Sequence, residues 1–580
     1  MIDAGRAVTV EPSREGSEHA ALWRVPPPIP AGARFTESAL LDSILFRRGV
    51  RSNADAHDFL NPRETPLGDP FLLPDMRSAV DLIRTAIGQQ QRIVVFGDYD
   101  VDGLTSTAML VRVLRRLGAD PIPIIPHRVR DGYGVNSESL QRIVETRPQL
   151  VITVDCGSSS QLEFEHLVEM GAQAIVLDHH QYSGSLPASV AFVSARRPDN
   201  AYPFADLAAV GVAYALARAL LGDDGASMYL PYVALGSVAD VVGLTGENRA
   251  LVARGLSKLR RWTLPGLIAL CDTAGVDQRT LNTWDIGYLL GPRLNAAGRV
   301  DTPRLALDLL LAEDIAAATP LASRLSELNA VRQGETRRTL DAAEAQLAEL
   351  GGATANAAIV LSGEGWNVGV VGLVAARVAE RHCRPTVVLE DAGAVSSGSA
   401  RTAGGVDIVK ALATCSDLLQ RFGGHSAAAG LSIASVDVPE LRRRLSGAVL
   451  EALGGQMPRR EHDIDAIASH ADLSLNTVDL LDRLEPCGEG NARPALLVPA
   501  LRQRYVKTSR DGAHLMFQVI DDAGYRHRAV MFGAGSRMLE LLACPSVDIL
   551  TRLDRDTWQG RTRLNLRVVD FRAAEPGNSP

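Results

Sequence analysis

Residues 92–105, which read RIVVFGDYDVDGLT, decide how the first part of this chain folds. The mainly apolar run Arg92 to Phe96 is typical of a strand. A helical pattern, Ala79 to Gln89, precedes this run, and another, Thr105 to Leu117, follows it. Helix, strand and helix in alternation predict an α/β fold with a mostly parallel sheet.

The same alternation continues further along the chain. Strand patterns at Leu150 to Val154 and at Ala174 to Leu177 flank a helical pattern at Leu162 to Met170. Each of the three strands ends in a polar cluster, and the clusters are Gly97-Asp98-Tyr99-Asp100, Asp155-Cys156-Gly157 and Asp178-His179-His180. Ligands of open α/β sheets bind just beyond the carboxyl ends of the strands, so we expect these clusters to meet in one crevice.

The aspartates of the first cluster predict a metal site. Asp98, Asp100 and Asp102 are three carboxylates in five residues, and such crowded carboxylates repel one another unless a cation neutralises them. Hard oxygen ligands suit magnesium or manganese. Taken alone, the segment could instead cap a helix, because aspartate near a helix start favours the helix dipole. The rest of the chain favours metal binding, since it adds further ligand types at matching places: Asp155, Asp178, His179, His180 and Asp240.

The composition indicates an ordinary globular chain of several domains. With 580 residues, 46% of them hydrophobic and 22% charged, the chain is too long for one core. Six scattered cysteines, no signal-peptide core and no apolar run of about 18 residues predict a cytoplasmic protein without a membrane segment. A net charge of −8 argues against a polyanionic partner, but Leu497 to Arg572 holds 13 Lys plus Arg against 8 Asp plus Glu. An acidic metal site with a basic strand-binding path gives this distribution.

Changes of pattern divide the chain into five predicted parts. Residues 1–34, rich in Pro, Glu and Ser, are expected to form a loose arm, and residues 35–304 an N-terminal segment plus the catalytic domain. Helix formers dominate a connector at 305–355. A second α/β domain is predicted at 356–456, and the short strands of 457–580 suit a small barrel.

Four motifs make the chain resemble the DHH phosphoesterases. They are DYDVDG at 98–103, VDCG at 154–157, DHH at 178–180 and VAD at 238–240, in the order seen in that family. GPRLNAAGR at 291–299 resembles a segment of the RecJ-type nucleases, and GGHSAAAG at 423–430 resembles the glycine-rich signature of the DHHA1 domain. The resemblance implies a DHH domain with a parallel sheet, a long helical connector, a DHHA1 domain and a C-terminal OB-fold-like barrel that binds single strands.

This resemblance also implies an activity: metal-dependent hydrolysis of single-stranded DNA from 5′ to 3′, in DNA recombination and repair. Two ions, Mn²⁺ or Mg²⁺, would bind at the positions that match the family's ligands, which are Asp100, Asp102, Asp155, His179 and Asp240. Asp98 would join or support them, and Asp178 and His180 complete the catalytic set. His180 would contact the phosphate, assist proton transfer or orient His179. Beside the DNA, the implied partners are a single-strand-binding protein and a helicase.

Six further residues are predicted to bind the substrate, namely Arg128, Arg293, Arg299, Ser399, Arg401 and His425. Of these, Arg128, Ser399 and Arg401 match the family's candidates for recognition of a 5′-phosphate, because a planar guanidinium suits phosphate oxygens. His425 lies in a glycine-rich run, where backbone can approach phosphates closely. For any one arginine, a solvated surface position is the alternative.

Two other functions stay open on the sequence. A DHH hydrolase of small substrates, such as oligonucleotides, cyclic dinucleotides or pyrophosphate, would not need residues 461–572. A non-catalytic replication scaffold would have lost metal ligands, and none is lost here. The chain departs from the family at Asn367, where the pattern has histidine after Trp366. We expect an altered substrate contact there, because asparagine cannot carry charge or move protons.

Overall fold

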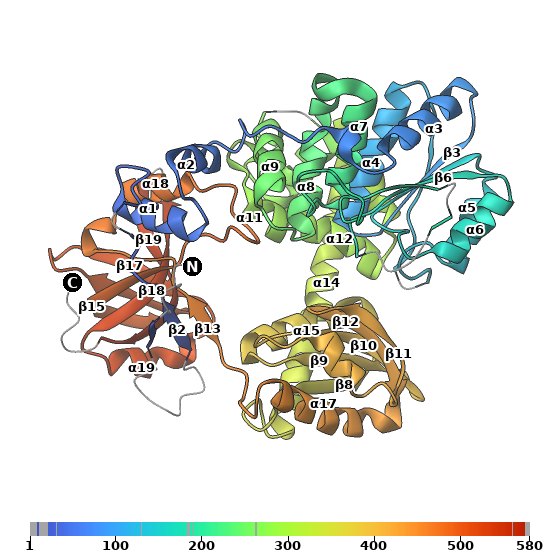
Figure 1. Ribbon diagram of the computed structural model, residues 1–580. Coiled ribbons are helices and arrows are strands. Elements are labelled where there is room, and N and C mark those ends of the chain that lie inside the picture. Colours follow the sequence, from blue (N-terminus) through green and yellow to red (C-terminus); the bar gives the residue numbers. More distant parts are fainter. Residues whose placement is uncertain are drawn as a thin grey trace. The chain divides into compact units, whose positions relative to one another are not determined.

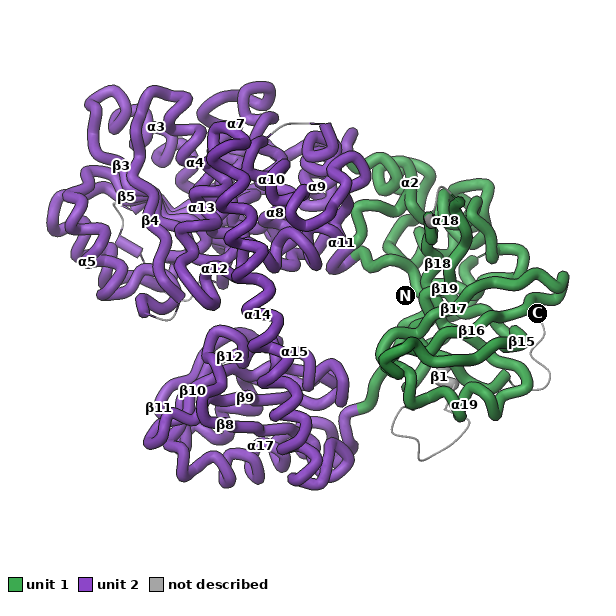
Figure 2. The backbone as a smooth tube through the Cα atoms, turned by 180° about the vertical axis from the view of Figure 1, so that it is seen from behind, with its two compact units in different colours: residues 1–62, 459–487, 491–580 green, residues 63–458, 488–490 purple. Residues whose placement is uncertain are grey.

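The computed structural model describes residues 8–10, 21–30, 32–128, 130–181, 186–187, 190–261, 264–558 and 561–574. The chain forms two compact units (Figure 2). Unit 1 joins residues 1–62 to 459–487 and 491–580, and unit 2 holds residues 63–458 with 488–490. Among the described residues, no helix is both long and apolar enough to cross a membrane.

Unit 2 begins with a five-stranded parallel sheet, and this confirms the predicted α/β fold (Figure 1). Its strands, in spatial order, are β4 (Ile122–Ile124), β3 (Ile93–Gly97), β5 (Leu150–Val154), β6 (Gln173–Leu177) and β7 (Ala191–Val193). Alternate residues of β3 enter different cores, since Val95 packs with one set of helices and Phe96 with another. The sheet is therefore buried on both faces, which explains why β3 reads as a continuous apolar run.

The helices that cover this sheet fall into two groups. One face packs against α3 (Met76–Gly88), α4 (Val101–Arg116) and α7 (Ala209–Ala226). The other face packs against α5 (Ser137–Glu145) and α6 (Gln161–Glu169). A largely helical part follows, with α8 (Leu230–Ala239), α9 (Gly246–Leu259), α10 (Pro265–Ala274), α11 (Thr283–Asp285), the π-helix η4 (Ile286–Leu290), α12 (Gly291–Val300) and α13 (Arg304–Leu311).

The connector is mainly one long helix, α14 (Ile315–Glu349), which continues through Pro320. Leu325 in its first half belongs to the core of the first sheet, and Leu347 in its second half belongs to the core of the next sheet. The connector is therefore packed along its length and is not a free linker.

The second sheet of unit 2 is mixed. Its strands, in spatial order, are β11 (Leu419–His425), β12 (Ala428–Ala434), β10 (Val395–Arg401), β9 (Thr386–Asp391) and β8 (Ile359–Glu364), and only β8 and β9 are parallel. Helices α15 (Val368–His382), α16 (Ile408–Ala413) and α17 (Val438–Ala452) pack on it. The predicted strands near Ile359 and Val387 are confirmed.

Unit 1 is built on a closed barrel. β15 (Leu496–Thr508) pairs with β16 (Leu515–Ile520) and with β18 (Val547–Trp558), and β17 (Arg526–Met531) and β19 (Arg561–Ala573) complete the ring. A barrel of this kind leaves no open sheet edge. This confirms the small C-terminal barrel expected from the sequence.

The N-terminal residues differ from the expectation in two ways. β2 (Leu22–Val25) lies in the predicted loose arm, yet it pairs with β13 (Glu461–Asp463), and Trp23 is only 2% exposed. The Trp23 indole N–H donates to Asp570 at 2.8 Å, which satisfies the polar atom of this buried ring. Helices α1 (Ala39–Arg47) and α2 (Asn53–Leu60), expected beside the catalytic domain, supply residues to the core of the barrel instead.

Candidate metal centre

The three polar clusters meet at the carboxyl edge of the first sheet, as the sequence predicts. Their ligand atoms form three groups, and within each group the atoms lie within 4.8 Å of one another. The groups are Asp98 with Asp100 and Asp155, Asp102 with His179 and Asp240, and Asp155 with His179 and His180. Asp155 and His179 each belong to two groups, so the seven side chains form one continuous site.

The start of α4 positions two of the aspartates. Asp100 caps this helix, because its Oδ1 accepts the backbone N–H of Asp102 at 3.0 Å. The helix-cap interpretation is therefore correct for Asp100, and it leaves the other carboxylate oxygen for a ligand. Asp102 is fully buried, and its two oxygens accept the backbone N–H groups of Ala209 and Val210, each at 2.8 Å. The first turn of α7 thus fixes the direction of the Asp102 carboxylate.

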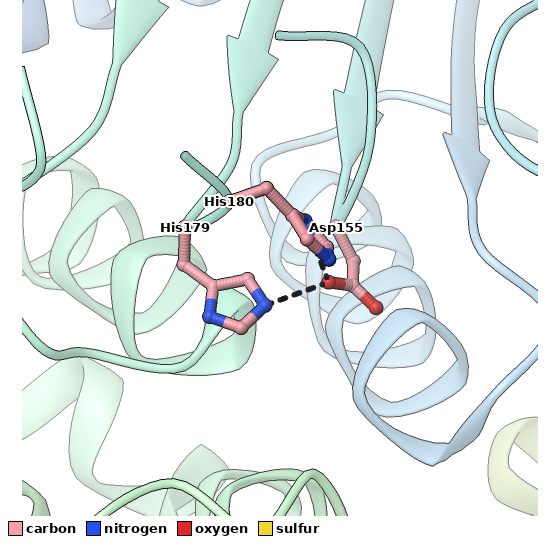
Figure 3. A group of neighbouring side chains, drawn as sticks. All are labelled: Asp155, His179 and His180. Atoms are coloured by element: carbon pink, nitrogen blue, oxygen red, sulfur yellow. Dashed lines mark ion pairs between the residues drawn. The ribbon is translucent and has the colours of Figure 1, made fainter. Parts of the chain in front are cut away.

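Asp155 and His179 hold buried polar atoms that have no hydrogen-bond partner in the described part of the chain. Asp155 follows β5 with a φ of 62°, a left-handed conformation that few side chains other than Asn and Asp adopt. Its carboxylate faces the His179 ring (Figure 3), and its Oδ1 lies 3.2 Å from His179 Nε2 without forming a hydrogen bond. Within the described part of the chain, Asp155 Oδ1 and both His179 ring nitrogens are buried without hydrogen-bond partners. Such atoms are costly to bury, and a shared cation would satisfy them.

The acidity of the carboxylates supports the same conclusion. Burial raises the pKa of Asp98 and of Asp155 well above the ordinary range, and the charges of neighbouring aspartates raise both further. Burial and the charge of Asp100 raise the pKa of Asp102 to about 7, and burial and the charge of Asp102 raise that of Asp240 to about 9. At neutral pH these groups cannot all ionise unless a cation compensates their charge. The donor set of carboxylates and imidazole suits manganese or magnesium.

The two histidines have opposite acid–base behaviour. Burial, together with the positive charge of His180, lowers the pKa of His179 to about 3. His179 is therefore neutral at pH 7, its contact with Asp155 is not an ion pair, and its ring is in the form that binds metals. Burial alone would lower the pKa of His180, but the hydrogen bond and the charge of Asp178 raise it above its ordinary value.

Asp178 orients the second histidine. Its Oδ1 accepts a hydrogen bond from His180 Nδ1 at 2.7 Å and from the backbone N–H of His179 at 2.8 Å, while its Oδ2 accepts the N–H of Ser158. The Tyr133 hydroxyl lies 3.2 Å from His180 Nδ1 and donates to the Asp155 carbonyl. Sequence reasoning took Arg128 from this segment and gave Tyr133 no role, because nothing in a tyrosine's neighbours along the chain indicates a contact with a histidine 47 residues away.

Three of the predicted substrate arginines are electrostatic neighbours. Burial, together with the charges of Arg128, Arg332 and Arg401, lowers the pKa of Arg299 to about 9. Burial and the charge of Arg128 also lower the pKa of Arg401. No ion pair with a carboxylate is found for these arginines among the described residues, although the charge of Arg128 lowers the pKa of the nearby Asp98. Arg128, Arg299 and Arg401 are thus placed as a site for an anion would require.

The other three predicted substrate residues lie in different surroundings. Ser399 lies beside Arg401, since a Cβ at Gly372 would come within 3.2 Å of its Oγ and within 3.0 Å of the Arg401 guanidinium. His425, on β11, is exposed and stacks on His180 with ring centroids 6.1 Å apart. Arg293 is turned to another partner: its Nη1 donates to the Leu289 carbonyl at 2.7 Å, and no described contact joins it to Arg128 or Arg401.

Asn367 has a structural role. Its Oδ1 accepts the backbone N–H of Gly369 at 2.8 Å and so caps α15. The carbonyl of Gly369 accepts a hydrogen bond from Arg299 Nη1 at 3.0 Å. The Asn367 side chain is thus engaged in the cap of α15. Its link to the predicted substrate residues runs through Gly369 to Arg299.

Family models match three regions of the chain. The "DHH family, N-terminal domain" matches residues 92–237, the "DHHA1 domain" matches 355–451, and the "RecJ OB domain" matches 464–570. These regions correspond to the parallel sheet with its helices, the mixed sheet and the barrel.

Curated and solved relatives agree with these models. The chain is 34% identical to the single-stranded-DNA-specific exonuclease RecJ of Bacillus subtilis, over 92% of this chain and 68% of that protein. It is 35% identical to the protein of that name from Dickeya dadantii, over 92% of this chain and 94% of that protein. A crystal structure of Thermus thermophilus RecJ in complex with Mn²⁺ matches with a TM-score of 0.81 and 31% identity, over 96% of this chain and 80% of that one. The chain belongs to the RecJ family.

Proposed function

We propose that this chain is a metal-dependent exonuclease that hydrolyses the phosphodiester bonds of single-stranded DNA in the 5′ to 3′ direction. The observation that carries the proposal is the group of buried carboxylates around Asp155, which cannot all ionise without cations, in a chain of the RecJ family. Single-stranded DNA is the substrate named for the curated relatives, and Mn²⁺ and Mg²⁺ are named for the solved ones.

Two divalent ions fit the donor set. Asp98, Asp100 and Asp155 would hold one ion, and Asp102, His179 and Asp240 would hold the other. Bound there, such a pair polarises a phosphodiester and lowers the pKa of a water molecule. Asp155 also groups with His179 and His180, and its buried Oδ1, which has no hydrogen-bond partner, lies 3.2 Å from His179 Nε2, so Asp155 would serve both ions.

Among the side chains of the site, His180 is the one that we propose acts in phosphate binding and proton transfer. Its ring is held between Asp178 and the Tyr133 hydroxyl, and the hydrogen bond and charge of Asp178 raise its pKa, which favours the protonated ring. A protonated ring at this place can hold a phosphate oxygen and deliver a proton to the leaving oxygen. Asp178 acts as the positioning residue, because it fixes the ring without reaching the ligand groups.

Recognition of the strand's end would fall to the arginine group. A terminal phosphate carries more negative charge than the internal ones, and Arg128, Arg401 and the Ser399 hydroxyl can read that charge through charge-assisted hydrogen bonds. Arg299 lies beside them and already donates to Gly369, which leaves part of its guanidinium for the strand. We propose that binding of the 5′-phosphate here sets the direction of hydrolysis.

Digestion of single-stranded DNA labelled at one end tests these statements together. Label at the 5′ end should appear at once as short products, and label at the 3′ end should stay on long strands until late, only when Mn²⁺ or Mg²⁺ is present. Early release of the 3′ label would contradict the direction, and equal hydrolysis in a chelator would contradict the metal dependence.

The cellular role is proposed from the family alone. We propose that the chain acts in the cytoplasm, in DNA recombination and repair, on strands that a helicase exposes and a single-strand-binding protein covers. Measuring hydrolysis of a strand saturated with single-strand-binding protein would check the last point. A rate on covered strands at or above that on bare strands supports a partnership, whereas simple inhibition contradicts it.

A further inference from the structure

An exposed aromatic pair lies just before α12. Trp284 and Tyr288 stack with ring centroids 5.4 Å apart and with their planes 22° apart. The two residues are 47% and 69% exposed. Side chains four apart on a helix project from the same side, so the two rings form one surface. Neither ring belongs to the hydrophobic core or to the metal centre described above.

The local structure presents this pair rigidly. Asn282 and Asp285 form a capping box at the start of α11, and Ile286 and Leu290 of η4 are buried in the core of the first domain. The opposite side of the helix is therefore anchored while the aromatic side faces outward. A π-helical turn is less stable than an α-helical one and is frequently kept at functional sites.

The helical segment that carries the pair continues to the metal centre. η4 runs directly into α12, whose first residue, Gly291, packs on Ala239, where a Cβ at Gly291 would lie 3.5 Å from that of Ala239. Ala239 precedes the predicted ligand Asp240. α12 then continues to Arg299, which belongs to the arginine group. One continuous helical segment thus joins the aromatic pair to both parts of the site.

Two arginines lie against the ends of the segment that carries the aromatic pair. Arg260 donates to the carbonyl of Leu281, just before α11, and Arg293 donates to that of Leu289, just after Tyr288. No carboxylate forms an ion pair with either arginine in the described part of the chain. The nearby Asp285 accepts the backbone N–H of Asn282 in the capping box. The surface therefore combines two ring faces with two uncompensated guanidinium groups.

We infer that Trp284 and Tyr288 form a stacking platform for unpaired bases of the DNA strand, with Arg260 and Arg293 on its phosphates. This inference rests on the proposed function. Aromatic rings beside a basic path are how proteins hold single strands without reading their sequence. Paired bases in a duplex have no free faces, so the platform would also favour single strands over duplexes.

Binding of oligodeoxythymidylate to the full chain, in a chelator that prevents hydrolysis, tests the inference. Trp284→Ala and Tyr288→Ala should each weaken binding by about 5-fold or more, since one stacked base contributes about 1–3 kcal/mol. Trp284→Phe and Tyr288→Phe keep a ring and should bind nearly as the wild type does. Leu162→Ala, an exposed apolar residue of α6, is the matched control and should change nothing.

An abasic strand of equal length separates stacking from charge. It should bind wild type and both alanine variants equally, because it offers phosphates and no bases. The inference is wrong if wild type and alanine variants bind oligodeoxythymidylate with equal affinity. It is also wrong if the alanine substitutions change only the oligomeric state of the protein. If wild type bound neither strand, the proposed function itself would fail, and the two failures are thus distinguishable.

Discussion

Asp155 links the two proposed ion sites, since its carboxylate groups with Asp98 and Asp100 on one side and with His179 and His180 on the other. We predict that Asp155→Asn, which keeps the size of the side chain, lowers the rate of hydrolysis by on the order of 10³-fold or more. A metal pair contributes several kcal/mol to transition-state stabilisation, and each 1.36 kcal/mol is about a tenfold rate. Single-turnover digestion and Mn²⁺ titration would measure this. An unchanged circular dichroism spectrum is the control, and a rate near wild type would place the site elsewhere.

The raised pKa values of Asp102 and Asp240 predict a pH dependence of stability. In the unfolded chain these carboxyls titrate near about 3.9, but in the folded protein they titrate at about 7 and about 9. The folded state therefore binds more protons than the unfolded state, and its stability falls as the pH rises through these values. In a chelator, the Tm should fall between about pH 6 and about pH 9.

Metal and substitution provide the controls for this trend. Saturating Mn²⁺ should remove it, because the ions replace the protons as compensating charge. Asp240→Asn should make it shallower, because an amide does not titrate. A Tm in chelator that stays level or rises over this range would contradict the electrostatic description of the site.

Arg401 carries the prediction on polarity. Arg401→Ala should lower activity on 5′-phosphorylated strands by roughly tenfold, the effect of one charge-assisted hydrogen bond, and should lower activity on 5′-hydroxyl strands much less. Arg443→Ala is the matched control, since Arg443 is an exposed arginine of the same domain that pairs with Glu440. Equal losses on both kinds of strand would indicate a general backbone contact instead.

The meeting of the predicted metal ligands at one place could be foreseen from the sequence, and some of their supporting contacts could not. Asp98, Asp155 and His179 follow apolar strands, and the ends of neighbouring parallel strands must meet at one edge. Tyr133 reaches His180 only because a loop folds back over the sheet, and a loop's path has no signature of spacing. The same limit applies to Arg293, because its motif predicted a substrate contact without indicating that its guanidinium donates to the Leu289 carbonyl, next to Tyr288.

Among the elements, α15 offers a direct test through its cap. Asn367→Ala should remove the hydrogen bond to the Gly369 N–H, which costs about 1 kcal/mol, whereas Asn367→Asp should retain it. Hydrogen exchange should become faster at the start of α15 in the alanine variant alone. Because Gly369 also accepts from Arg299, the alanine variant should bind strands more weakly. Unchanged exchange in Asn367→Ala would show that the cap has no structural effect.

Regular elements with their own apolar pattern were predictable. β16 was expected at Leu515 to Ile520 and spans those residues, because its strand ends in turns on both sides. β2 was not expected, since its few apolar residues are embedded in a polar segment, and its partner β13 lies more than 400 residues away. Strands of this kind are specified by their partner and not by local pattern.

At the scale of the whole molecule, unit 1 is assembled from both ends of the chain. Leu41 and Ile44 of α1 share a core with Leu496 and Phe517 of the barrel. The sequence indicates a domain boundary after residue 456. If that boundary were the whole description, a chain that ends there would lack the barrel and keep all other domains intact. The shared core makes such a deletion unsuitable, because α1 and α2 would keep their apolar faces and lose the barrel residues that those faces pack against.

A chain of residues 63–458 is therefore the appropriate deletion of unit 1. We predict that it keeps metal-dependent hydrolysis of short oligonucleotides, because the metal centre and the arginine group lie entirely in unit 2. Its affinity for long strands should fall, and the salt dependence of binding should become shallower by about 0.7 for each phosphate that the protein no longer neutralises. Binding measured at several salt concentrations would show this.

The control for this deletion lacks only residues 459–580. It should aggregate, since α1 and α2 keep their apolar faces without the barrel core.

Both deletions also remove one contact within unit 2. Residues 488–490 belong to that unit, and the Glu489 carbonyl accepts the N–H of Leu244 at 2.8 Å. That bond lies at the loop after Asp240, so a modest decrease in rate on short oligonucleotides is expected in the folded deletion. Unchanged affinity and an unchanged salt slope for long strands would mean that unit 1 does not hold the strand, and the basic excess of the barrel would then need another explanation.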